Sequence, residues 1–373
     1  MTDRLHIVCL DAPSPPDYGG AIDMFYKIKA LAAIGKKIHL HYFQYAGNRG
    51  VGDLDKICEK VYPYARKKGL KGIRFNLPYI VSTRINNLLI QRLNEDDAPI
   101  ILEGIHCTGI IPFINNRQRK IMVRVHNNEA VYYHRLALAE SNFAKRFYYK
   151  IESRLLNRYQ NKLSQNAIYA CLSRADEDVF KNDYHLSKVV FIPSFVAWQQ
   201  VLNKSGNGGY CLYHGNLSVS ENKEAVTWLI KHVFSQLNIP FIIAGKGIST
   251  SLMQACSRLP HIRLITHPSM SEINELVENA QINVLPSVNN TGVKLKLLHA
   301  LFRGRYVLTN KNGVAGSGLE NAVTIAESGE EWKVAINQLF KKELSQAEIA
   351  NRQKLLELYN NEKNAQLISA QLQ

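Results

Sequence analysis

A polar turn and the helix-like pattern after it, at residues 290–304, have the residue types of an anion-binding site. The first backbone N–H groups of a helix have no partner within the helix, and the helix dipole adds partial positive charge there. The turn could therefore present donors to a phosphate, and Lys294 and Lys296 would add full charges. A surface helix with solubilising lysines is the alternative. The predicted turn consists of Asn290, Thr291, Gly292 and Val293.

Two predicted strands flank this segment. Residues 282–287 form a short apolar run closed by proline, and residues 305–310 form a second run. In a doubly wound sheet, a helix between two parallel strands begins at the carboxyl ends of the strands, where ligands bind. The flanks therefore favour a phosphate site over a solubilising surface.

A glycine pair follows the first predicted strand. Gly19 and Gly20 come after the proline-rich loop 11–17 and before a predicted helix at 22–33. Glycines there would let the backbone approach a diphosphate closely, although a Gly-Gly pair is also a common simple turn. Its position after the first strand favours the binding role.

A polar group follows the predicted strand at 121–125. His126, Asn127 and Glu129 lie within a segment of six residues. A single histidine at a strand end is usually structural, but packing explains this whole polar group poorly. We therefore predict that this group contacts a donor or acceptor sugar. Glu103, after the strand at 100–102, is a second carboxylate at the same predicted edge, with a structural role favoured.

Short apolar runs alternate with helix-like patterns along the chain, which predicts mostly parallel sheets. The alternation lapses in the polar segment 197–210. We therefore predict two Rossmann-like domains, at 1–196 and 197–345, and a terminal helix at 346–373 that packs back across both and breaks at Asn360-Asn361. The predicted strands are 5–10, 38–43, 100–102, 121–125, 167–172 and 189–192, then 210–214, 241–244, 262–266, 282–285, 306–309 and 323–326.

The cysteines and the apolar runs indicate the compartment. Six cysteines are scattered without a Cys-x-x-Cys pair or metal-like spacing, which indicates free thiols in a reducing environment. The first apolar run has the length of a strand, and no run reaches the ~18 residues of a membrane span. We predict a soluble cytoplasmic protein.

The net charge of +15 is uneven. Residues 1–190 hold 29 Lys/Arg against 18 Asp/Glu, and residues 191–373 hold 17 against 13. One basic cluster, between residues 56 and 75, is interleaved with apolar and aromatic residues, as in surfaces that meet anionic lipid. A solvated basic face is the alternative, and nucleic acid is disfavoured because no nucleic-acid motif is present. The cluster contains Lys56, Lys60, Tyr62, Tyr64, Arg66, Lys67, Lys68, Leu70, Lys71, Ile73, Arg74 and Phe75.

Residues 291–320 resemble the donor-site pattern of retaining nucleotide-sugar glycosyltransferases of the GT-B fold, in the broad family 4. That pattern joins Gly-x-x-x-Lys, a Leu-Glu-Ala helix, Gly-x-x-Val-Val and a Gly-Leu turn. Gly215 and Asn216 lie in a stretch similar to the Gly-Asn-Leu opening of the family's C-terminal domain. Gly245 and Lys246 lie in one similar to the strand and glycine turn beside the nucleotide.

The N-terminal half carries further matches, so the resemblance covers most of the chain. Residues 124–133 resemble a His-Asn-x-Glu signature, followed by Tyr-Tyr, of bacterial members. By this resemblance His126 and Glu129, with Lys296 from the donor site, are the predicted catalytic residues. Asn127 is predicted to bind substrate.

Three positions depart from the family pattern. Many members have two glutamates eight residues apart around the donor-site loop, where this chain has Thr291 and His299. His299 could still hydrogen-bond a ribose. Asn216 stands where many members carry a phosphate-binding arginine, so the diphosphate charge would fall mainly on Lys294, Lys296 and the helix N-terminus.

The resemblance implies two domains that face a central cleft and a nucleoside-diphosphate sugar as donor substrate. It further implies transfer, with retained configuration, to a saccharide or lipid-linked saccharide in cell-surface polysaccharide synthesis. The predicted donor site has neither an Asp-x-Asp pair nor a carboxylate cluster, so we expect no metal and no further cofactor. A sugar-nucleotide epimerase of the same architecture is an alternative that the basic face disfavours. A catalytically impaired sugar-nucleotide-binding homologue is another, suggested by the missing glutamates.

Overall fold

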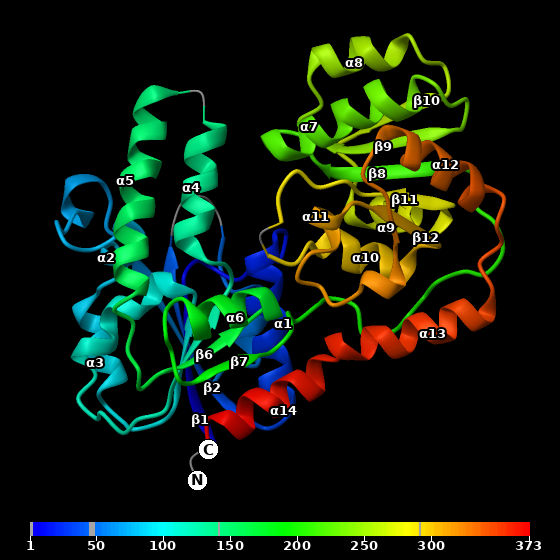
Figure 1. Ribbon diagram of the computed structural model, residues 1–373. Coiled ribbons are helices and arrows are strands. Elements are labelled where there is room, and N and C mark those ends of the chain that lie inside the picture. Colours follow the sequence, from blue (N-terminus) through cyan, green and yellow to red (C-terminus); the bar gives the residue numbers. More distant parts are fainter. Residues whose placement is uncertain (1–2, 45–48, 141, 291) are drawn as a thin grey trace. The chain divides into compact units, whose positions relative to one another are not determined.

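The computed structural model describes residues 3–44, 49–140, 142–290 and 292–373. The chain divides into two compact units (Figure 1). Unit 1 contains Met1–Ala197 together with Tyr359–Gln373, and unit 2 contains Trp198–Leu358. In the described residues, no helix combines the length and the apolar character that crossing a membrane requires.

A parallel sheet forms the centre of unit 1. Among the described residues its strands follow the order β3-β2-β1-β4-β5-β6-β7. The order therefore reverses between β1 and β4, which is where a doubly wound sheet opens a crevice at its carboxyl edge. The strands are β1 (Arg4–Cys9), β2 (Lys37–Gln44), β3 (Lys60–Ala65), β4 (Ile100–Glu103), β5 (Ile121–Val125), β6 (Ile168–Cys171) and β7 (Val189–Phe191).

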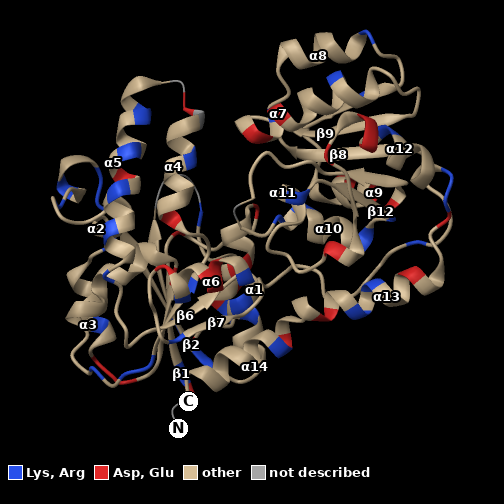
Figure 2. Cartoon of the chain, in the orientation of Figure 1, with Lys and Arg blue, Asp and Glu red and all other residues tan. Residues whose placement is uncertain are grey.

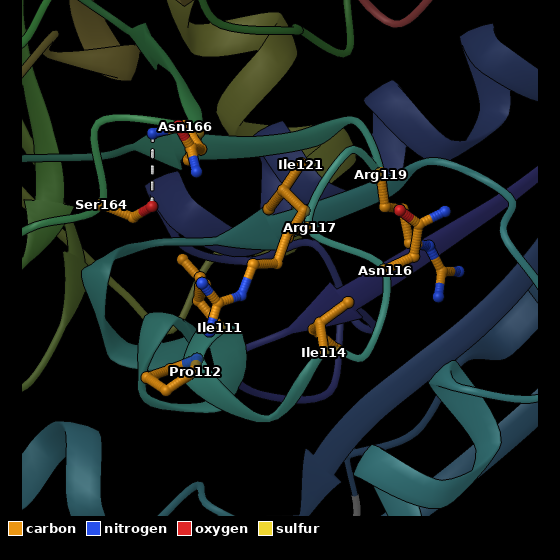
Figure 3. Close-up of a pocket in the computed structure, with 10 residues that line it drawn as sticks. Ile111, Pro112, Ile114, Asn116, Arg117, Arg119, Ile121, Ser164 and Asn166 are labelled. Atoms are coloured by element: carbon orange, nitrogen blue, oxygen red, sulfur yellow. Dashed lines mark hydrogen bonds between the residues drawn. The ribbon is translucent and has the colours of Figure 1, made fainter.

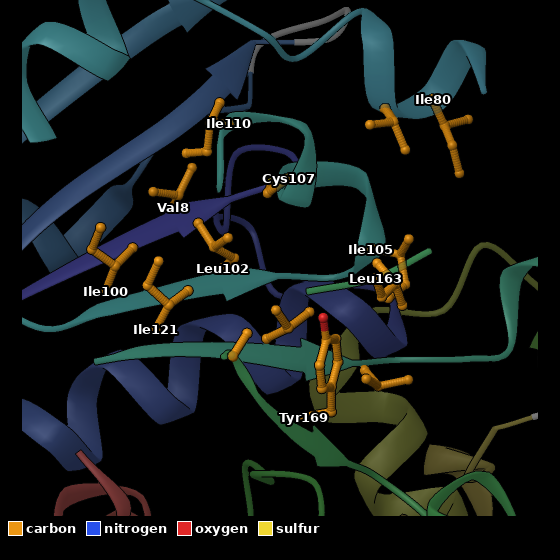
Figure 4. Close-up of a cluster of buried hydrophobic side chains, with 14 of the residues drawn as sticks. Val8, Ile80, Ile100, Leu102, Ile105, Cys107, Ile110, Ile121, Leu163 and Tyr169 are labelled. Atoms are coloured by element: carbon orange, nitrogen blue, oxygen red, sulfur yellow. The ribbon is translucent and has the colours of Figure 1, made fainter. Parts of the chain in front are cut away.

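Both faces of this sheet are covered. Val8, Leu102 and Val123 pack in one core cluster (Figure 4), while their neighbours Ile7 and Ile101 face a second cluster on the other side. Two buried faces produce continuous apolar runs, which is why most of these strands were predictable. The helices are α1 (Gly19–Ala33), α2 (Tyr79–Ser82), α3 (Asn87–Leu93), α4 (Glu129–Ala139), α5 (Phe143–Gln160), α6 (Arg174–Asn182) and α14 (Asn361–Gln371).

Strand β3 was not predicted. It pairs with β2 along the edge of the sheet and buries Tyr64 in the core. Its sequence lacks a continuous apolar run because an edge strand is only partly covered, and Pro63 is tolerated because it lies on that edge. Part of the basic cluster therefore belongs to the sheet rather than to a surface loop.

Unit 2 repeats the parallel arrangement. Its described strands follow the order β10-β9-β8-β11-β12-β13, which reverses between β8 and β11. The predicted strands of this half are confirmed to within about two residues at their ends. The strands are β8 (Cys211–Asn216), β9 (Phe241–Lys246), β10 (Ile262–Thr266), β11 (Ile282–Val284), β12 (Tyr306–Thr309) and β13 (Thr324–Ile325). The helices are α7 (Ser220–Leu229), α8 (Thr250–Ser257), α9 (Met270–Asn279), α10 (Leu295–Arg303), α11 (Lys311–Val314), α12 (Gly329–Phe340) and α13 (Gln346–Leu356).

The terminal segment is divided between the units. The sequence predicted one element over 346–373, but α13 belongs to unit 2 and α14 to unit 1. The break falls where it was predicted, because the side chain of Asn360 caps the N-terminus of α14. Asn361 then exchanges two hydrogen bonds with the backbone of Val196, at 2.8 and 3.0 Å. These bonds fix the start of α14 to the end of the contiguous part of unit 1.

Candidate functional site

Two glycines meet at the carboxyl ends of β8 and β9. Gly215 and Gly245 are paired in the parallel register, and a Cβ atom on Gly245 would collide with the carbonyl oxygen of Gly215. Packing therefore explains why Gly245 is a glycine, beside the substrate-binding role predicted from the resemblance. Lys246 and Asn216 at the same strand ends are exposed.

Lys296 is a half-buried cation that forms no ion pair with the carboxylates of the described residues. Its ammonium group lies 3.1 Å from the hydroxyl of Tyr213 and 3.0 Å from Oδ1 of Asn222. Among the described residues no acidic side chain forms an ion pair with it. Burial, followed by the charge of Lys294, lowers the pKa of Lys296 to about 8. An ammonium in this position favours an anionic ligand that would restore its lost solvation.

The predicted anion-binding turn lies before the helix and not within it. Helix α10 begins at Leu295, and Lys294 is its N-cap residue. Gly292 has a φ of +63°, so the helix cannot extend through it. The assignment of helical N–H donors to Gly292 and Val293 is therefore wrong, and Thr291, the third predicted donor, lies outside the described residues. Substrate binding by Asn290 stays a prediction. Lys294 remains beside the site, where its ammonium donates to Oδ1 of Asn289 at 2.6 Å.

His299 is part of the packing of unit 2. Its ring stacks on Trp198 with centroids 4.7 Å apart, and its Nε2 lies 2.8 Å from Oδ1 of Asn274. Only 4% of the residue is exposed, and burial, followed by Arg303, lowers its pKa to about 4. The predicted ribose contact is therefore not supported, because these neighbours already account for the imidazole.

In unit 1 the glycine pair begins a helix. Helix α1 starts at Gly19, three residues earlier than predicted, and its N-cap residue Tyr18 provides no side-chain cap. The first N–H groups of α1 are therefore left for another acceptor. Gly20 lies beside His126, because a Cβ atom on it would come within 3.8 Å of Nδ1 of His126. The structure thus brings two predicted site residues together.

A buried network of charges holds His126. Its Nε2 lies 3.0 Å from Glu103, whose carboxylate also bonds the ammonium of Lys27 at 2.8 and 2.9 Å. Although burial alone would raise it, Lys27 and His126 hold the pKa of Glu103 below its usual value. Glu103 is then ionised and accepts a hydrogen bond from the Nε2–H group of His126. In the neutral imidazole, this tautomer has Nδ1 as its hydrogen-bond acceptor.

The network continues to Asp23. Its carboxylate bonds Lys27 at 2.8 Å and Arg124 at 3.0 Å, and it accepts the backbone N–H of Phe195 at 2.8 Å. Burial opposes ionisation here as well, but Arg124 and Lys27 outweigh it and lower the pKa of Asp23. Two cations and two carboxylates therefore satisfy one another inside unit 1.

Two groups of residues have the spacing of metal ligands. Asp23, Glu103 and His126 form one, but the ammonium of Lys27 bonds both of its carboxylates. The other contains His6, His39 and Asp96, and the guanidinium groups of Arg4 and Arg119 bond its carboxylate. In both groups protein cations already balance the carboxylates.

Glu129 is a buried carboxyl group at the first position of α4. Burial raises its pKa to about 8, against the effect of a hydrogen bond with Asn127. It is therefore mainly protonated at neutral pH and can donate a hydrogen bond. The side chain of Asn128, the residue between Asn127 and Glu129, has a structural role. It caps the N-terminus of α4, and its Oδ1 accepts a hydrogen bond from Nε2 of Gln160 at 3.0 Å.

Sequence reasoning missed Arg84 and His106. Arg84 donates to the carbonyl of Leu10, just after β1, at 2.8 Å, and burial lowers its pKa to about 10. His106 follows β4, and its buried Nδ1 has no hydrogen-bond partner in the described part of the chain. Neither residue lies in a recognisable motif, whereas Asn222 in unit 2 lies five residues after the Gly-Asn-Leu stretch and could have been chosen.

A cavity of about 330 Å³ lies elsewhere in unit 1 (Figure 3). Ile121, the first residue of β5, and Ser164, which precedes β6, both line it, so it opens at the amino-terminal edge of the sheet. Ligands of doubly wound sheets bind at the opposite edge. This cavity is therefore separate from the candidate site.

Comparison with known proteins gives a family match within unit 2 and a relative that covers most of the chain. Residues 208–342 match the family model of the glycosyl transferases group 1. A protein from the cps region of Klebsiella pneumoniae, described only as an uncharacterized 44.6 kDa protein, is 27% identical over 348 residues, which is 88% of each chain.

Solved structures with the same fold cover nearly the whole chain. TarM superposes with a TM-score of 0.67 at 11% identity, covering 99% of this chain and 98% of TarM. HepE from Anabaena, solved in complex with UDP, gives a TM-score of 0.65 at 14% identity, covering 100% and 99%. With two parallel-sheet units of this topology and a second unit that matches group 1, the chain is a glycosyltransferase of the GT-B fold.

Proposed function

We propose that this enzyme transfers a sugar from a nucleoside-diphosphate sugar to a saccharide or lipid-linked saccharide in the synthesis of a cell-surface polysaccharide. The observation that carries the proposal is Lys296, a half-buried cation whose hydrogen-bond partners among the described residues are both neutral. A diphosphate leaving group is the anion that this position would stabilise. The UDP in the HepE structure and the cps-region origin of the K. pneumoniae relative agree with the proposal.

The reaction would need no metal and no separate base. Lys296, Lys294 and the first N–H groups of α10 would stabilise the diphosphate as its bond to the anomeric carbon breaks. The acceptor oxygen would form the new bond on the same face of the sugar. Its proton would pass to the departing phosphate oxygen, which retains the configuration and balances the step.

The polar group of unit 1 would contact the sugars. Nδ1 of His126 would accept a hydrogen bond from a sugar hydroxyl, because Glu103 fixes the Nε2 proton. The protonated Glu129 would donate one. Gly19 and Gly20 would offer the N–H groups of α1 to a further anionic group. In unit 2, Gly215 and Gly245 would let the nucleotide approach the strand ends, beside Asn216 and Lys246.

The basic cluster of unit 1 would meet an anionic membrane surface, and the exposed Lys68, Lys71 and Arg74 would provide the charge. Such contact would keep the enzyme near lipid-linked acceptors without a membrane span.

Incubation with a panel of nucleotide sugars tests the proposed function. We expect release of nucleoside diphosphate from one donor, slowly by hydrolysis and faster with a saccharide acceptor, with the mass of the product raised by one sugar. Conversion of the donor to an epimer, or tight nucleotide binding without turnover of any donor, would contradict transfer.

UDP affinity should depend on pH through Lys296. A lysine whose folded pKa is lowered to about 8 is charged below that pH and neutral above it. We expect the affinity to be constant below pH 8 and then to fall by up to about tenfold per pH unit. Lys296→Arg should remove this slope because arginine stays charged. Calorimetric titration with UDP from pH 7 to 10 measures both, and an equal slope in the two proteins would reject the assignment.

Glu129→Gln should retain most of the activity at pH 7. Glutamine still donates a hydrogen bond, as the protonated carboxyl does, so we expect kcat/KM within about threefold of wild type. Glu129→Ala should lower it by about 10²-fold. A loss of equal size in both variants would show instead that the ionised carboxylate acts as a base.

A further inference from the structure

We propose that an apolar groove in unit 1 binds the hydrocarbon chain of a phosphate-linked lipid acceptor. This inference rests on the proposed function, since it names the class of its acceptor. The groove is a cavity of about 490 Å³ between residues 69–79 and one side of α5. That volume lies within the ~300–1,000 Å³ of small-molecule sites. Its apolar lining includes Leu70, Ile73, Phe75, Tyr79, Ile151 and Leu155.

The lining is open to solvent. Phe75 is 94% exposed, Leu70 85% and Ile73 50%. A contiguous apolar surface of this kind on a folded protein is typical of a binding site. The one carboxylate in the lining, Glu152, is buried and accepts the backbone N–H of Ile80 at 2.8 Å. It faces the first turn of α2, so its charge does not oppose a hydrocarbon or a phosphate.

Basic residues surround the groove. Lys68, Lys71 and Arg74 are exposed in the segment that forms one wall, and Lys150 and Arg154 are exposed on α5. Figure 2 shows basic residues along α5 and in the loop beside α2. An apolar groove with a cationic rim complements a ligand that joins a hydrocarbon chain to a phosphate. An acidic or neutral protein segment would match only one of these two features.

A chain of contacts joins the groove to the site of unit 1. The guanidinium of Arg66, just after β3, lies 5.6 Å from the ring centre of Tyr79 in the groove and donates to Thr83 Oγ1 at 3.0 Å. The next residue, Arg84, donates to the carbonyl of Leu10 after β1. Both arginines therefore lie at the carboxyl edge of the sheet.

This continuity favours a lipid-linked acceptor over the acyl chain of a bilayer lipid. A hydrocarbon chain in the groove would place its phosphate toward Arg66 and Arg84. The attached saccharide would then extend along the same edge of the sheet, toward His126 and Glu129. A bilayer lipid would need the groove but not the arginines that lead to the site.

The test compares farnesyl phosphate with isopentenyl phosphate, which has the same headgroup and a shorter chain. We expect the full-length enzyme to bind farnesyl phosphate at least about tenfold more tightly. Ile151→Glu should remove this preference. Phe147→Glu, an equal charge on an exposed residue of α5 outside the lining, should retain it. Unchanged UDP affinity in both variants would show that they are folded.

Other outcomes identify other occupants and overturn the proposal. Equal affinity for farnesyl phosphate and isopentenyl phosphate would show that the groove does not bind the hydrocarbon chain. A loss of binding to phosphatidylglycerol vesicles in Ile151→Glu but not in Phe147→Glu, without a chain-length preference, would assign the groove to the bilayer. A dimer that Ile151→Glu dissociates would assign it to a second copy. If the enzyme prefers farnesyl phosphate but turns over no nucleotide sugar, the lipid-binding role of the groove is supported and the proposed sugar transfer is rejected.

Discussion

Replacing Lys296 with alanine should lower kcat by about 10²- to 10³-fold, the effect of removing one preorganised donor to a developing negative charge. In the described part of the chain, the ammonium bonds Tyr213 and Asn222, which are both neutral, so we expect its charge to be available to a diphosphate. Lys296→Arg should recover part of the rate, since it restores the charge with a different shape. Turnover at fixed, saturating donor concentration measures both variants.

The stability of the same variant separates this role from a structural one. Removing a half-buried cation that lacks an ion pair relieves a desolvation cost, so Lys296→Ala should unfold at the same or a higher temperature than wild type. Lys223→Ala, at an exposed lysine of α7, should change neither rate nor stability. Normal turnover in Lys296→Ala would reject the donor site, and a large loss of stability would make Lys296 a structural residue.

Asp23→Ala should destabilise unit 1 by about 3–5 kcal/mol, because it leaves the buried cations Lys27 and Arg124 short of a partner. It also removes the acceptor of the Phe195 N–H. Urea unfolding followed by circular dichroism measures the loss. Asp178→Ala, at an exposed acid of α6, should cost less than about 0.5 kcal/mol.

UDP binding provides a second measure for Asp23→Ala. The proposed nucleotide-binding residues lie in unit 2, so we expect UDP to bind still to the variant at low temperature. A loss of less than about 1 kcal/mol would mean that Lys27 and Arg124 are adequately balanced without Asp23, and that the network does not hold His126 in place.

Strands buried on both faces were predictable because their apolar runs are continuous. The same argument failed at the edge strand β3, where Pro63 and Lys60 interrupt the run. The start of α10 was predicted too early, because the sequence does not reveal that Gly292 adopts a left-handed backbone conformation. Family resemblance led to Lys296, but its lack of a carboxylate partner depends on tertiary packing.

The site of unit 1 shows the same limit. His126 and Glu129 were chosen from a short polar motif, and the network that holds His126 joins residues up to 172 positions apart. Arg84 lies in the turn between α2 and α3 and belongs to no motif, so only the fold shows that its guanidinium reaches the end of β1. His299 looked like a ligand-binding residue, and only the stacked Trp198 reveals its packing role.

The split of unit 1 has a consequence for biosynthesis. Ala365 and Ile368 of α14, and Leu372 directly after it, belong to the same core cluster as Met24 and Ile28 of α1. On the ribosome, residues 359–373 emerge only after all of unit 2 has been made. Unit 2 is contiguous and can fold as soon as it has been made. Unit 1 is made first, but its core stays incomplete, with the apolar side of α1 uncovered, until α14 has been synthesised. The order of folding is thus the reverse of the order of synthesis, and an early stop codon after unit 2 would damage the unit that was translated first.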